Sequence, residues 1–201
     1  VDADGRWVAW TPGGYFDGFG EEVEPSELSA AVARAAAVDG ATWVKLIGDW
    51  PRRGQGAPAS FDELALHQAV EIAHRGGCRV AIHTCAPRTA SLAVAAGVDS
   101  IEHGLFLTAA DVAALGARRG AWVPTIDAME AIRDQLGPAS SGGRMFAEGL
   151  ANVRALFPGA VEAGVVVLAG SDLHLAHGQV AHEAAKLLEY GMTATDALAA
   201  L

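Results

Sequence analysis

The chain has 201 residues, of which 51% are hydrophobic and 19% are charged, enough apolar material for one domain with a substantial core. Its net charge of −10 argues against a nucleic-acid-binding surface, because phosphate contacts need clustered Lys and Arg. No apolar run approaches the roughly 18 residues that a membrane span requires. Two cysteines, Cys78 and Cys85, are too few for a disulfide framework. We therefore expect a soluble, cytoplasmic protein with reduced cysteines that binds neither nucleic acid nor membrane.

One pattern recurs along the chain: an alanine-rich amphipathic stretch ends at glycine, and a short apolar run follows. Such runs are typical of strands buried on both faces, as in a parallel sheet. They predict strands at 6–10, 42–47, 79–83, 99–103, 121–125 and 165–169. The amphipathic stretches predict helices at 25–38, 61–75, 88–96, 109–119, 143–157, 179–190 and 194–201. Capping boxes are expected at 60–63, 108–111 and 193–196.

Strands that alternate with helices predict an α/β fold built from right-handed βαβ units. The chain supplies six predicted strands, whereas a closed (β/α)8 barrel needs eight and typically about 250 residues. Two arrangements fit this count. One is an open doubly wound sheet, but no GxGxxG or Walker-type loop opens a helix. The other is a TIM-type barrel, in which residues 1–201 are a single domain covering about strands 3–8 and lacking its N-terminal βα units.

Polar residues stand at the ends of four predicted strands. Lys45 lies within an apolar strand, His83 and His103 close two others, and Asp172 follows the last. Taken singly, a strand-end histidine is more often structural, Asp172 fits a helix N-cap, and Lys45 can reach solvent from a barrel mouth. In a parallel barrel, however, all the strand ends converge on the face where such enzymes carry their chemistry. Imidazole and carboxylate are zinc ligands, so the set predicts a metal site.

The segments that contain these residues resemble a known family. Residues 43–46, 80–83, 100–104 and 169–172 are similar to the strand-4, strand-5, strand-6 and strand-8 motifs of the amidohydrolase superfamily. Residues 95–104, 123–125 and 182–193 resemble its imidazolonepropionase-like and Xaa-Pro dipeptidase-like branch. The resemblance covers nearly the whole chain from about residue 13. It implies a metal-dependent hydrolase that cleaves a C–N bond in an amide, dipeptide or cyclic amide with metal-activated water.

The resemblance also implies roles for the strand-end residues. Lys45 would be a carboxylated lysine bridging two metals, His83 and His103 would hold the second metal, and Asp172 would bind the first metal and act as general base. The cofactor would be zinc, with one or two ions in the full-length protein. One feature departs from the family, because the His-x-His pair that holds the first metal does not occur before Lys45. We therefore interpret the sequence as part of a longer chain, and expect residues 1–201 alone to retain metal weakly and to be inactive.

Residues that follow the strands are candidates for substrate contacts: Tyr15, His174 and His177, and also Asp49 and Trp50. The expected partner is a small-molecule substrate, whose identity depends on variable loops, and a homo-oligomer is left open. Two alternative functions remain. One is a mononuclear, imidazolonepropionase-like cyclic amidohydrolase with an unmodified lysine. The other is a catalytically inactive barrel used for binding.

Overall fold

A computed structural model describes residues 6–10, 20–38, 40–51, 56–172, 176 and 178–201. The chain forms two compact units, residues 1–101 and 102–201. The boundary between them falls within strand β5 (Ser100–His103). Among the described residues, none of the helices combines the length and apolarity needed to span a membrane.

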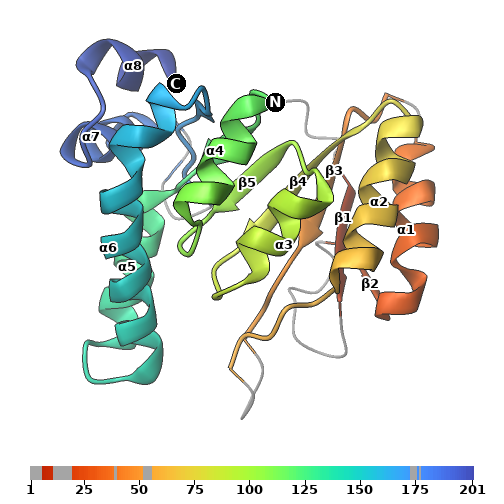
Figure 1. Cartoon of the computed structure of the whole chain (residues 1–201). Helices are drawn as coiled ribbons and strands as arrows, with labels where there is room; N and C mark the ends of the chain where they lie inside the picture. The colour runs from red at the N-terminus through yellow and green to blue at the C-terminus, as the bar shows by residue number, and fades with distance from the viewer. Residues whose placement is uncertain (1–5, 11–19, 39, 52–55, 173–175, 177) are drawn as a thin grey trace. The chain divides into compact units, whose positions relative to one another are not determined.

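The first unit alternates strands and helices (Figure 1). Its strands are β1 (Arg6–Trp10), β2 (Glu21–Val23), β3 (Trp43–Ile47) and β4 (Arg79–Thr84), in the order β2-β1-β3-β4 with β5 beside β4. Its helices are α1 (Leu28–Ala36), α2 (Glu63–Arg75) and α3 (Thr89–Ala96), with a 3₁₀ helix at Pro25–Glu27. Helices α1 and α2 pack side by side, α1 against β1 and β3 and α2 against β4. The pairs β1–β3 and β3–β4 are parallel, as predicted, and the unpredicted strand β2 also pairs in parallel with β1.

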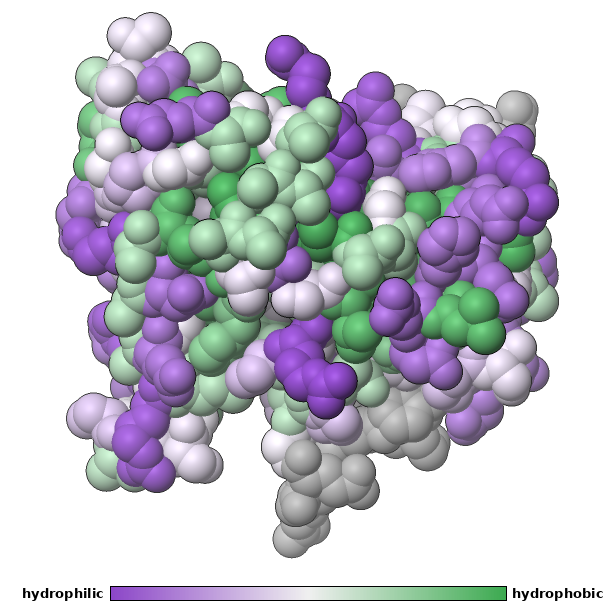
Figure 2. Space-filling model, viewed as in Figure 1, coloured by the Kyte–Doolittle hydropathy of each residue, from purple (hydrophilic) through white to green (hydrophobic). Residues whose placement is uncertain are grey.

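Burial alternates along β3 and β4. The side chains on one face are fully buried: Val44, Leu46, Val80 and Ile82. The other face is half-buried at Trp43, Lys45, Ala81 and His83, whereas Ile47 on that face is buried. The prediction that these strands are buried on both faces therefore holds at Ile47 but not at those four residues. Among the described residues, helices cover one face, and the other face carries the polar side chains. Figure 2 shows that the surface over the helices includes many hydrophilic residues.

The second unit contains strands β6 (Ala121–Val123) and β7 (Val166–Val167), which pair in parallel, with β5 beside β6. Its helices are α4 (Ala109–Ala117), α5 (Ile126–Leu136), α6 (Ser141–Glu162), α7 (Ala181–Glu189) and α8 (Ala194–Ala199). Helices α5 and α6 run side by side (Figure 1), α6 also packs on α4, and α5 also packs on α7. In the core, the ring of Trp122 meets that of Phe157 edge-on at 5.6 Å.

Several local predictions need correction. Strand β2 and helix α5 were not predicted, and α6 is longer than the helix expected at 143–157. The capping box at Thr108 is confirmed, and Thr193 caps α8. The capping box at Ser60 is wrong, because α2 starts later and Asp62 caps it by accepting a bond from the amide of Ala65 at 2.8 Å. An aspartate nearer the helix start thus replaces the predicted serine.

Candidate active site

The register between β3 and β4 places Lys45 and His83 on one face of the first unit. Lys45 pairs with Ala81, and Ile47 pairs with His83. Paired residues point to the same side and residues two apart share a face, so the Lys45 and His83 side chains emerge on the half-buried face. Lys45 and His83 therefore share one face of the sheet, and their grouping in a metal site stays a prediction. Lys45 is half-buried rather than fully buried.

Asp49 holds the segment that follows His83. Its side chain is 0% exposed, and its carboxylate accepts bonds from the amides of Cys85, at 3.1 Å to each oxygen, and of Ala86 at 3.0 Å. Its Oδ1 lies 3.6 Å from Nε2 of His83, whose ring lies 5.3 Å from that of Trp50. The expectation that Asp49 contacts substrate is therefore wrong. A buried carboxylate needs hydrogen-bond donors, and the carboxylate of Asp49 finds them in backbone amides of the loop between β4 and α3.

The chain between Lys45 and Asp49 passes very close to β4. The amide of Gly48 donates to the carbonyl oxygen of His83 at 2.9 Å. A Cβ atom at position 48 would lie 2.6 Å from that same oxygen and 2.8 Å from Cγ2 of Thr89. Only glycine fits this close backbone approach, which fixes the end of β4 where His83 stands.

In the second unit, His103 is held from two sides. It is 2% exposed, and its Nδ1 lies 2.6 Å from Oγ1 of Thr125. Its carbonyl oxygen accepts a bond from the indole Nε1 of Trp122 at 2.9 Å. Thr125 follows β6, so two adjacent strand ends fix both the ring and the backbone of this histidine.

Asp172 stands on the other side of the same imidazole. Its Oδ2 lies 4.0 Å from Nε2 of His103, and its side chain is 39% exposed. The alternative that Asp172 caps the following helix is wrong, because α7 begins at Ala181 and has Val180 at its N-cap position. His103 and Asp172 thus lie near each other within this unit, and their roles as metal ligands stay a prediction.

Three strand ends of this unit share an uncommon backbone conformation. The φ angles are 64° at His103, 48° at Thr125 and 44° at Asp172. Non-glycine residues rarely adopt this left-handed region, and a β-branched residue such as Thr125 is a clear outlier there. Each such residue costs on the order of 1–3 kcal/mol and persists only where surrounding contacts enforce it. Backbone strain therefore gathers at the three positions that surround the imidazole.

Glu183 lies in the first turn of α7 and is 0% exposed, and it was not among the predicted site residues. Its carboxylate accepts bonds from the amides of Ile126 at 2.7 Å and Asp127 at 3.0 Å, the first turn of α5. Burial raises the pKa of Glu183 to about 7, although the two amide bonds oppose this rise. An acidic residue in an otherwise apolar stretch of the helix face was the available signal.

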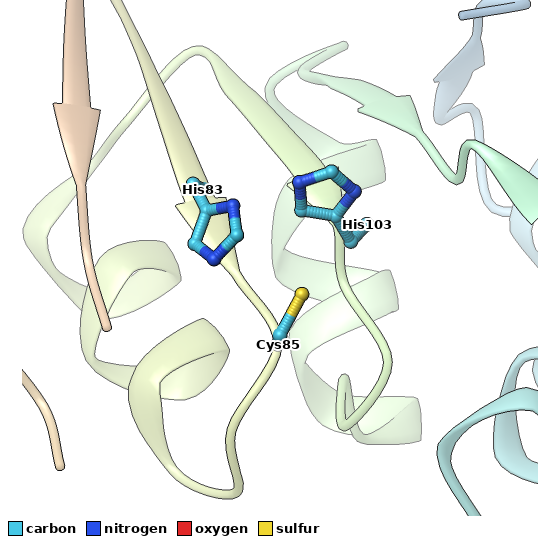
Figure 3. Close-up of side chains that lie close together, drawn as sticks. All are labelled: His83, Cys85 and His103. Carbon is cyan, nitrogen blue, oxygen red and sulfur yellow. The ribbon is translucent and has the colours of Figure 1, made fainter. Parts of the chain in front are cut away.

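Three residues able to offer ligand atoms to a metal are labelled in Figure 3. His83 lies near the end of β4 and Cys85 directly follows β4 in the first unit, and His103 ends β5 in the second. Cys85 was not predicted as a ligand. The structure thus presents Lys45 with His83 in one unit and His103 with Asp172 in the other. The predicted substrate contacts Tyr15, His174 and His177 lie outside the described residues.

Proteins of similar sequence were found by comparison, although no family model matches the chain. An uncharacterized protein of Mycobacterium tuberculosis is 39% identical over 211 residues, which cover 98% of this chain and 54% of that protein. A protein of Mycobacterium bovis matches with the same identity and coverage. The chain therefore spans about half the length of the curated relatives it matches.

Solved structures give a more specific relationship. A Xaa-Pro dipeptidase with methionine bound in its active site is 28% identical, with a TM-score of 0.71 over 89% of this chain and 46% of that one. Ochratoxinase from A. niger is 20% identical, with a TM-score of 0.79 over 98% of this chain and 52% of that one. A prolidase in complex with N-methylphosphonate-L-proline is 19% identical, with a TM-score of 0.73 over 98% of this chain and 54% of that one.

The last two structures share the fold alone at such identities. Together, the parallel α/β sheet and the matches to amidohydrolase barrels relate this chain to the amidohydrolase superfamily. Within that superfamily, the relationship is to the Xaa-Pro dipeptidase-like proteins, as the sequence motifs had indicated.

Proposed function

We propose that the full-length protein is a metal-dependent hydrolase that cleaves the C–N bond of an amide, dipeptide or cyclic amide. The observation that carries the proposal is His103, whose Nδ1 is engaged by Thr125 while its Nε2 faces the carboxylate of Asp172. The relationship of the chain to hydrolases of the Xaa-Pro dipeptidase type supports an amide bond as the target.

The donor set of the second unit fits a divalent metal. Two ligands of one tetrahedral zinc, each about 2.1 Å from the ion, lie roughly 3.4 Å apart. Nε2 of His103 and Oδ2 of Asp172 are 4.0 Å apart, a separation that suits ligands of two neighbouring ions better than ligands of one. Nitrogen and carboxylate ligands suit zinc. The hydroxyl of Thr125 on the opposite ring nitrogen is the kind of outer contact that orients metal-binding histidines.

We further propose that the described strands belong to a (β/α)8 barrel, about strands 3–8. In that barrel, Lys45 as a carbamate would be a ligand of both ions, His83 and His103 would be ligands of the second ion, and Asp172 would be a ligand of the first. The His-x-His pair of the first metal would come from outside these 201 residues. Relatives about twice as long support this arrangement.

The residues of this chain have defined tasks in the reaction. A metal held by these residues would lower the pKa of the attacking water and polarise the scissile carbonyl. Asp172 accepts the proton of the attacking water at its carboxylate and passes it to the leaving nitrogen, as a general base and then a general acid. Thr125 and Trp122 keep His103 oriented, and Asp49 fixes the loop beside His83. The substrate carbonyl carbon forms a C–O bond as its C–N bond breaks.

The test is hydrolysis by the purified full-length protein loaded with zinc. Substrates are Xaa-Pro dipeptides, other dipeptides, N-acyl amino acids and cyclic amides, and the free amine formed by hydrolysis is measured. We expect turnover of at least one class, loss of turnover on chelation and its return with zinc. A protein that binds zinc stoichiometrically but cleaves none of these, cyclic amides included, would contradict the proposal.

One observation favours the mononuclear alternative enough to keep it. Lys45 is half-buried, and the long stem of a lysine can carry its charged amine from such a position to solvent. A protonated lysine does not form a carbamate. Metal analysis of the full-length protein separates the two readings, because two ions per chain indicate the carbamate-bridged centre and one ion indicates an unmodified lysine.

A further inference from the structure

We propose that Glu183 is a positioning residue that fixes the imidazole of His103, acting through Thr125. The chain of contacts runs from α7 through the start of α5 to the end of β5, wholly within the second unit. The inference uses the proposed function only in taking His103 as a site residue.

The first link joins Glu183 to the start of α5. Each carboxylate oxygen of Glu183 accepts one backbone amide, that of Ile126 at 2.7 Å and that of Asp127 at 3.0 Å. The first amides of a helix have no partner within the helix. Thr125 at the N-cap position makes no side-chain cap here, so Glu183 caps α5 from 57 positions further along the chain.

The second link is the backbone of Thr125. Its φ of 48° is unfavourable for a β-branched residue. Such a conformation persists where neighbouring contacts over-determine it. The two residues directly after Thr125 are the ones whose amides Glu183 binds, and Thr125 itself is 3% exposed. The two bonds that the Glu183 carboxylate accepts therefore hold Thr125 in the conformation that directs its side chain to His103.

The third link follows from counting protons. The Thr125 hydroxyl has one proton, which it donates to the carbonyl oxygen of Pro124 at 2.8 Å. At 2.6 Å from Nδ1 of His103, the same oxygen must then act as acceptor. His103 therefore carries its proton on Nδ1, and its Nε2, which faces Asp172, presents a lone pair. This is the tautomer a metal ligand or a neutral acceptor at Nε2 requires.

The test compares substitutions of Glu183 and Thr125 with a control substitution of Glu130. Glu183→Gln keeps the volume and one acceptor, and Glu183→Ala removes both acceptors. Glu130→Gln is the matched control, because Glu130 also links α5 to α7, through Lys186 at 2.7 Å and Tyr190 at 3.0 Å, without touching the start of α5. Thr125→Val removes the hydroxyl that contacts Nδ1 of His103, and Thr125→Ser retains that hydroxyl.

The readout is the tautomer of His103, from the ¹⁵N chemical shifts of its ring in the full-length, metal-free protein labelled at histidine. We expect the Nδ1–H form in the parent protein, in Glu130→Gln and in Thr125→Ser. Thr125→Val and Glu183→Ala should lose that signature, and Glu183→Gln should show a mixture. Zinc affinity is measured separately. It should fall about 10–100-fold for Thr125→Val, the usual effect of removing a group that orients a metal-binding histidine, and about 10-fold for Glu183→Gln.

Unchanged His103 ring shifts in a folded Glu183→Gln or Glu183→Ala protein would overturn the inference. If the alanine variant does not fold, the glutamine variant decides, because it fills the same space. A loss of the signature in Glu130→Gln as well would also overturn it, since general docking of α7 would then be responsible. Because the shifts are read without metal or substrate, a protein that proves to lack hydrolase activity leaves this result intact.

Discussion

Nε2 of His103 lies 4.0 Å from Oδ2 of Asp172, although one residue closes β5 and the other follows β7. The two side chains differ in exposure, since His103 is buried and Asp172 is partly open to solvent. The buried, oriented imidazole of His103 suits a metal ligand, whereas the accessible carboxylate of Asp172 suits a proton acceptor. Substitutions at the two positions should therefore have different consequences.

Asp172→Asn should remove the proton acceptor while retaining an oxygen ligand of the same size. We expect a fall in kcat of about 10²–10⁴-fold, the usual value of general acid–base catalysis, with much of the metal retained. Metal analysis and steady-state kinetics on the same preparation measure both quantities. Normal turnover in this variant would exclude Asp172 as the general base.

Lys45→Ala should reduce the zinc content, because the proposed carbamate is lost with the amine. Short-chain carboxylates such as acetate or propionate should partly restore zinc and activity by replacing its two oxygens. Lys186→Ala is the matched control, since that lysine lies on a helix and pairs with Glu130 of α5 and Glu189 of α7. Full zinc content in Lys45→Ala would favour the mononuclear alternative.

Gly48→Ala should destabilise the fold by about 1–3 kcal/mol, as overpacking does. The new Cβ would lie 2.6 Å from the carbonyl oxygen of His83, so the end of β4 must shift. Gly159→Ala in α6 is the control, because nothing lies within 4 Å of its Cβ position and alanine favours a helix over glycine. Denaturant unfolding of both variants checks this, and equal stabilities would show that the close approach is unimportant.

The stability of the protein should depend on the ionisation of Glu183. Burial raises the pKa of this carboxyl from 4.5 to about 7, helped by the charges of Asp127 and Glu130. Between these two pH values the folded state holds the proton more tightly than the unfolded state, so the contribution of Glu183 to stability falls as pH rises from about 4.5 to 7, and is then constant. Relative to Glu183→Gln, the parent protein should lose on the order of 3 kcal/mol over this range.

Urea unfolding of both proteins at several pH values measures that difference. Glu189→Gln is a useful control of opposite sign, because the bonds from Arg154 and Lys186 lower the pKa of the Glu189 carboxyl. Its contribution to stability is present at neutral pH and is lost on acidification. A difference between parent and Glu183→Gln that stays flat from pH 4.5 to 7 would contradict the raised pKa.

Sequence patterns predicted the elements whose signals are local. The strands that carry Lys45, His83 and His103 were located by short apolar runs, and the start of α4 by the capping box at Thr108. Helix α5 was missed for a physical reason. It begins directly after β6 with a left-handed Thr125 and no side-chain cap of its own, and the groups that cap it belong to Glu183 in α7. A cap supplied by a distant helix leaves no signal near the helix it caps.

The sequence by itself determined the alternation of strands and helices, the family relationship and the choice of Lys45, His83, His103 and Asp172, because apolar periodicity and short motifs are properties of neighbouring residues. Only the tertiary structure decided how those side chains are held. The burial of Asp49 beside His83, the nitrogen of His103 that faces Asp172 and the hold of Glu183 on α5 each depend on residues from different elements. Such contacts arise when the chain packs, since a buried polar group must find its partner wherever the fold brings one.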